Sequence, residues 1–139
     1  MNAIDTNILV RFYVEDPSDP EAMRQRPIAR RIVEKSRAVH VPVTVVQELV
    51  WVLIGHYEFG NDDCANVVEH LAGLPNVHLD RKREILEAAR LFRAGLDFAD
   101  AMHLSQSAHC EKFLTFDDRR FARRASKLQA PTRVEVPRI

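Results

Sequence analysis

The sequence predicts one α/β domain, built around a central parallel sheet of about four to five short strands and covered by helices on both faces. Two observations favour this fold class. Short apolar runs such as VHVPV and NVHL alternate along the chain with longer segments of helical periodicity, as in βαβ units. The length of 139 residues fits a single domain, and we expect that domain to span residues 1–139.

Each element follows from its local pattern. Strands are expected at residues 2–5, 39–43, 76–79, 112–116 and 133–137. Helices are expected at residues 7–15, 21–37, 44–59, from 61 or 62 onward, and at 81–95, 97–110 and 118–128. Thr44 and Gln47 have the spacing of a capping box, Asn61 or Asp62 is expected to cap the next helix, and Gly95 has the C′ position that closes a helix.

Composition excludes several classes of protein. No apolar stretch is long enough to span a bilayer, and the N-terminus lacks the features of a signal peptide. Cys64 and Cys110 stand far apart without paired spacing, which favours buried thiols in a reducing compartment over a disulfide framework or a zinc site. These features predict a cytoplasmic protein.

Basic residues are concentrated in two segments, although the net charge is zero. Arginines and lysines crowd residues 24–37 and 119–127. Two interpretations remain open: a solvated helix face, or a rim that contacts nucleic-acid phosphates, for which the planar guanidinium of arginine is well suited. As members of such a rim we assign Arg11, Arg119 and Arg120.

Two acidic residues follow apolar strands. Asp5 ends the first expected strand and Asp117 ends the fourth, so a parallel sheet would deliver both carboxylates to the same edge. Helix capping is the alternative role for Asp5, because Asp readily accepts hydrogen bonds from the free amides of a following helix. Asp118 is interpreted as the cap of its own helix.

Three further acids lie in helical segments. Glu48 sits among apolar residues and either faces water in a narrow polar stripe or lines a cleft. Asp97 has the position of an N-cap. Asp100, three residues later on the same face, has no such structural role and is therefore the stronger candidate for a functional site.

Converging carboxylates without adjoining cations repel one another and favour a bound cation. Oxygen ligands select hard divalent ions, so we expect Mg²⁺ or Mn²⁺ and, with one or two such ions, phosphodiester hydrolysis. The expected catalytic and metal-binding residues are Asp5, Glu48, Asp100 and Asp117. Thr6, Asn7 and Thr115 are expected to orient these carboxylates through hydrogen bonds.

The stretches AIDTNILVR, VTVVQELVWVL, DFADAMHL and FLTFDDRRF resemble, in order and spacing, the motifs of the PIN domain, and most closely those of VapC toxins. The resemblance implies a three-layer α/β/α sandwich and a Mg²⁺- or Mn²⁺-dependent endoribonuclease. It further implies a homodimer, an RNA substrate and a small cognate antitoxin. The family's acidic quartet carries over onto Asp5, Glu48, Asp100 and Asp117, its polar residue in the first motif onto Asn7, and its hydroxyl onto Thr115. Some members of the family also use an acid at the position of Asp97, so the resemblance makes Asp97 a further candidate metal ligand.

Other classes stay open at this point. A phosphoacceptor receiver domain would need paired acids after the first strand and a late lysine, and the chain has DTN there and no lysine after Lys127. A PIN-type nuclease outside toxin pairs, acting on RNA or DNA, is one alternative, and a catalytically silent module with an acidic cleft is another. Trp51 is expected in the core or a dimer interface, and His103 is expected to be packed or on the surface.

Overall fold

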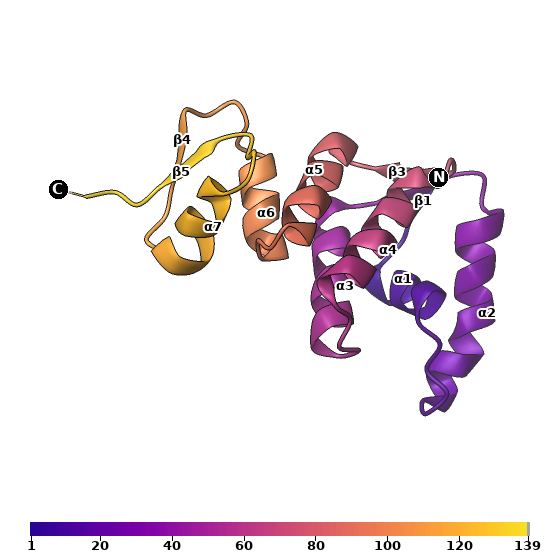
Figure 1. The fold of residues 1–139 in the computed structure, drawn as a ribbon. Coiled ribbons are helices and arrows are strands. Elements are labelled where there is room, and N and C mark those ends of the chain that lie inside the picture. The colour runs from indigo at the N-terminus through magenta and orange to yellow at the C-terminus, as the bar shows by residue number, and fades with distance from the viewer. Residues whose placement is uncertain (139) are drawn as a thin grey trace.

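A computed structural model describes residues 1–138 (Figure 1). The strands are β1 (Asn2–Ala3), β2 (Val39–Val41), β3 (Val77–Leu79), β4 (Lys112–Leu114) and β5 (Arg133–Glu135). The helices are α1 (Thr6–Tyr13), α2 (Pro20–Lys35), α3 (Val43–Gly55), α4 (Asn61–Gly73), α5 (Lys82–Arg93), α6 (Phe98–Ser105), the π-helical turn η1 (Asp118–Ala122) and α7 (Arg123–Ser126). The predicted α/β class, with parallel strands between helices, is confirmed.

The strands are divided between two parallel sheets, so the expected single sheet of four to five strands is wrong for this arrangement. The first sheet has the order β1-β2-β3, with Asn2 opposite Val39 and Val39 opposite Val77. The second contains β4 and β5, with Phe113 opposite Val134. Among residues 1–138, neither the second edge of β1 nor the second edge of β4 pairs with another strand.

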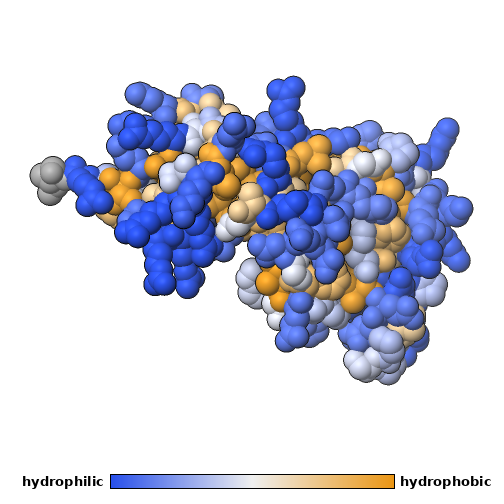
Figure 2. All heavy atoms as spheres, viewed as in Figure 1, coloured by the Kyte–Doolittle hydropathy of each residue, from blue (hydrophilic) through white to orange (hydrophobic). Residues whose placement is uncertain are grey.

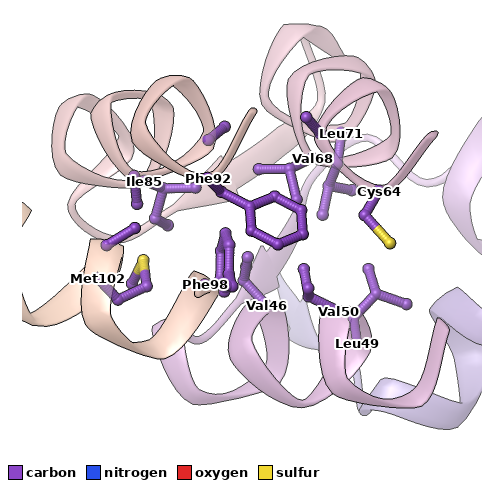
Figure 3. Packing of buried hydrophobic residues seen from close by; sticks show 14 of the residues in the cluster. Val46, Leu49, Val50, Cys64, Val68, Leu71, Ile85, Phe92, Phe98 and Met102 are labelled. Atoms are coloured by element: carbon purple, nitrogen blue, oxygen red, sulfur yellow. The ribbon is translucent and has the colours of Figure 1, made fainter. Parts of the chain in front are cut away.

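A large part of the hydrophobic core lies between the helices of residues 43–105, and it continues to α1, α2, β2 and Phe121 (Figure 3). Side chains of α3, α4, α5 and α6 point toward one another there, with Phe92 and Phe98 in edge-to-face contact at a centroid distance of 5.5 Å. Burial of such large apolar groups supplies most of the driving force for folding. This core fixes α3 and α6, which carry candidate site residues.

Residues 112–138, here called the C-terminal unit, pack against the outer side of α5 and α6 (Figure 1). Phe113 stacks on His103 at a centroid distance of 6.3 Å and contacts the buried Phe121. Arg124 donates a hydrogen bond to the carbonyl of Gly95 at 3.1 Å. In Figure 1, α5 and α6 stand between this unit and β1, so the chain itself keeps the two sheets apart.

Helix ends agree only partly with the sequence. Gly95, at φ +123°, closes α5 as predicted, because its backbone N–H and that of Leu96 bond back to the last turn. The capping box of Thr44 and Gln47 is wrong, since α3 begins one residue earlier, after Pro42. The cap at Asn61 or Asp62 is also wrong, because Gly60 has that position and no side chain caps the helix.

The two cysteines differ in exposure. Cys64 is buried, as predicted, whereas Cys110 is exposed, so the prediction of a buried thiol there is wrong. Cys110 lies between α6 and the C-terminal unit, where the chain turns over the surface instead of entering the core. Within residues 1–138, no helix is both long and apolar enough to cross a membrane.

Candidate functional site

Asp5 and Glu48 are joined through Thr6. Asp5 follows β1, and its Oδ1 accepts a hydrogen bond from the backbone N–H of Thr6 at 2.7 Å, so its capping role is confirmed. Thr6 is buried, with 5% of its surface exposed, and its hydroxyl donates to Oε1 of Glu48. The start of α1 therefore fixes a carboxylate of α3 beside that of Asp5.

These two acids line a hollow of about 470 Å³. Asn7 and Arg11 line it as well, and both Asp5 and Glu48 are exposed to solvent. Of the two interpretations of Glu48, the structure supports an open cleft, and its carboxylate is not desolvated by the apolar residues around it in the sequence. Trp51 borders the same hollow and is 76% exposed, so of its two expected places the core is wrong, and the dimer interface stays a prediction.

Asp97 and Asp100 lie at the start of α6. Asp97 has the N-cap position, but only its backbone carbonyl bonds to the helix, at 2.8 Å from the N–H of Ala101, and its side chain makes no capping bond. Asp100 is half-buried, and burial followed by the negative charge of Asp97 raises its pKa. Asp117 raises this pKa further, whereas Arg124 lowers it.

Asp117 precedes η1 and caps it. Its Oδ1 accepts a hydrogen bond from the backbone N–H of Arg120 at 2.9 Å, and its own N–H donates to Oγ1 of Thr115 at 3.0 Å. The expected cap at Asp118 is therefore wrong by one residue, and Asp118 instead forms an ion pair with Arg123 at 2.9 Å. Thr115 is thus in contact with the main chain of the acid that it was predicted to orient.

The candidate acids form two separate groups in one chain. The first acid group is Asp5 and Glu48, and the second is Asp97, Asp100 and Asp117. The expectation that Asp5 and Asp117 share one sheet edge is not met, because β1 and β4 belong to different sheets. Within residues 1–138, no three acidic, histidine or cysteine side chains lie close enough together to hold a metal ion.

The chemistry of both groups suits a hard divalent ion, since every donor is a carboxylate, hydroxyl or amide oxygen. Their placement within one chain supplies only part of such a ligand set.

The predicted rim residues fall beside both groups. Arg11 lines the hollow and is held by Gln25, at 3.0 Å, and by Asp19, at 3.8 Å. Arg119 and Arg120 are exposed next to Asp117. Sequence reasoning missed Arg124, whose charge acts on Asp100. The sequence did indicate a basic segment at residues 119–127, which contains Arg124. Which arginine of that segment faces α6, however, depends on how the chain turns from η1 into α7.

Carboxylates that follow parallel strands and begin helices, with oxygen donors around them, define an α/β protein with an acidic site. The profile of the PIN domain matches residues 3–127, and the chain therefore belongs to the PIN domain family. PIN domains are generally nucleases, so the hydrolase class predicted from the sequence agrees with the family. No curated protein sequence matches the chain significantly.

Proposed function

We propose that the protein is a metal-dependent endoribonuclease and the toxin of a toxin–antitoxin pair of the VapC type. The observation that carries the nuclease proposal is the position of the acids within the family match: Asp5, Glu48, Asp100 and Asp117 all fall inside residues 3–127. The resemblance of the four motifs to VapC toxins supports the finer assignment.

The side chains of the first acid group have a defined geometry for this role. Thr6 orients Glu48 toward Asp5, and Asn7 adds an amide at the same wall of the hollow. Arg11 contributes a positive charge that suits a phosphate of the RNA backbone. In the second group, Asp100 and Asp117 supply carboxylates, with Asp97 as the further candidate ligand.

We propose Mg²⁺ or Mn²⁺ as the cofactor, held by these carboxylates. A bound ion would neutralise charge on the scissile phosphate and lower the pKa of the attacking water. The protein's own contribution is to hold the carboxylates in place through α1, α3 and α6, and to position the substrate backbone by arginines at the rim.

The proposed partner is a small antitoxin, encoded beside the toxin, that blocks the acidic hollow. An arginine of such a partner would form bidentate hydrogen bonds with paired carboxylates such as Asp5 and Glu48. We propose that it acts in the cytoplasm.

A cleavage assay on short single-stranded RNA with millimolar Mn²⁺ or Mg²⁺ tests the nuclease. Asp100→Asn and Asp117→Asn should each reduce cleavage by orders of magnitude while keeping the shape of the site. Asp63→Asn is the matched control, because it removes the same charge from an exposed position on α4. Equal cleavage by all three variants, or none by the wild type with either ion, would contradict the proposal.

Induced expression without a partner tests the toxin assignment. Growth should stop with the wild-type chain and continue with Asp100→Asn, and co-expression of the adjacent small gene should restore growth. Sustained growth at a high level of active enzyme would instead favour a nuclease of general RNA or DNA processing.

A further inference from the structure

The two parallel sheets leave four strand edges unpaired within residues 1–138, those of β1, β3, β4 and β5, and the edges of β1 and β4 concern us here. β1 ends the first sheet, and β4 ends the second. Strands of parallel sheets are normally covered on both faces, yet Asn2 and Ala3 of β1 are exposed. Unpaired strand edges present free backbone groups that pair readily with another chain.

Large apolar side chains accompany these edges. Leu114 at the end of β4 is 59% exposed, and Phe116, two residues later, is 85% exposed. Met1, next to β1, is 78% exposed. Figure 2 shows apolar patches on the C-terminal unit, and a hollow of about 740 Å³ opens there between the strands and α7, with Leu114 and Val134 in its wall. Such surfaces mark interaction sites.

The two edges cannot meet within one chain in this arrangement. The C-terminal unit is anchored to the outer side of α5 and α6 by Phe121 and by the hydrogen bonds of Arg124 to Gly95 and of Arg90 to Gln129. Residues 106–111, which connect α6 to β4, lead away from β1 (Figure 1). In a second copy of the chain the same two strands have free edges.

The charges of the two parts are complementary. The C-terminal unit has eight basic and three acidic side chains, a net charge of +5, whereas residues 1–111 have twelve basic and seventeen acidic ones, a net charge of −5. The chain as a whole is neutral. Two copies can therefore exchange oppositely charged parts without building up charge in the dimer.

We propose that the protein forms a two-fold symmetric dimer by strand exchange, in which β4 of each copy pairs with β1 of the other. Each half of the dimer then contains a five-stranded parallel sheet in the order β3-β2-β1-β4-β5, in which the free edges of β1 and β4 are paired and β3 and β5 remain the outer strands. The acids follow: Asp5 and Glu48 of one copy meet Asp117 of the other at the same sheet edge. That last consequence rests on the proposed function, whereas the exchange itself does not.

Cross-linking tests the exchange without any activity. The variant Asn2→Cys/Phe116→Cys, made with Cys110→Ser, places one thiol on β1 and one just after β4, while Cys64 stays buried. A short bismaleimide should convert it into a covalent dimer, whose yield does not fall on dilution. Light scattering of the untreated protein should give twice the chain mass. A cross-link within one chain at monomer mass would overturn the proposal.

A matched control separates specific contact from collision. Ser18→Cys replaces Asn2→Cys in the loop before α2, and it should give no covalent dimer. An equal yield of covalent dimer in the control would count against exchange through β1 and β4. So would a main variant that is dimeric by light scattering but forms no cross-link, either between the copies or within one chain.

Complementation tests the shared site. Asp5→Asn and Asp117→Asn chains with different tags are co-expressed, and the mixed dimer is isolated by both tags. Strand exchange gives one site with both substitutions and one intact site, so RNA cleavage should return to about half of the wild-type value per dimer. If each chain instead completed its own site, every site would carry one substitution and the mixed dimer would stay inactive. An inactive wild type beside a cross-linked dimer would reject the nuclease but leave the exchange standing.

Discussion

Asp97 and Asp117 offer a direct comparison, because both hold N-cap positions and only one makes a side-chain cap. The carboxylate of Asp117 accepts the N–H of Arg120 at 2.9 Å, whereas the side chain of Asp97 makes no capping bond. Truncation of each to alanine should therefore affect the free energy of unfolding differently. We expect Asp117→Ala to destabilise the protein and Asp97→Ala to leave it nearly unchanged.

The magnitude follows from the lost hydrogen bond. Replacing an Asp N-cap by Ala costs roughly 0.5–2 kcal/mol, and the exposure of Asp117 favours a value of about 1 kcal/mol. In a domain of this size that corresponds to a fall of roughly 3–5 °C in Tm. For Asp97→Ala, an exposed side chain without a bond, the change should stay within about 0.5 kcal/mol.

Urea unfolding followed by circular dichroism, in EDTA to remove metal effects, measures both changes. Asp117→Asn is the control, because asparagine caps about as well as aspartate and should restore stability without restoring the charge. A loss of stability in Asp97→Ala equal to that in Asp117→Ala would refute the distinction between the two acids. So would an unchanged Asp117→Ala.

Four further predictions concern the same elements. Millimolar Mn²⁺ should raise the unfolding free energy relative to EDTA, by about 2.7 kcal/mol at a hundredfold excess over Kd, and unchanged thermal midpoints would contradict a metal site. Thr6→Val should lower the free energy of unfolding in urea by about 1–2 kcal/mol, because the hydrogen bond to Glu48 is lost. The double variant Thr6→Val/Glu48→Ala should cost no more than that, since the same bond is lost, and additive costs would contradict the bond. A colorimetric thiol reagent should modify Cys110 alone in the folded protein, because Cys64 is buried and its pKa is raised to about 11; rapid modification of two thiols would show otherwise. Asp100→Asn should stabilise the metal-free protein at neutral pH, because the raised pKa of Asp100 means that folding disfavours its ionised form. This gain in stability should vanish below the ordinary pKa of an aspartate, where the carboxyl is neutral in both states. A gain that persists in acid would point to another cause.

The elements themselves were largely predictable from the sequence. Each of the five expected strands contains an observed one, because short apolar runs bounded by turn residues have few other structures available. The helix closed by Gly95 was correct for the same local reason, since a positive φ there suits only glycine well. Caps failed where a neighbouring residue competed, as at Asp118, because a one-residue shift in helix start depends on packing and not on the cap alone.

The candidate site was predictable as a list of residues but not as a geometry. The local sequence pattern predicts that Asp5 and Asp117 follow parallel strands. Whether β4 can pair with β1 of the same chain depends instead on the path of residues 106–111, which carry no pattern of their own. Hydrophobic periodicity specifies which face of a strand is buried, and it is silent on whether the neighbouring strand comes from the same chain. For that reason the proposed dimer can unite the first and second acid groups in one site although they do not lie together in one chain, and the exposed Phe116 after β4 is the apolar side chain that such a contact would cover.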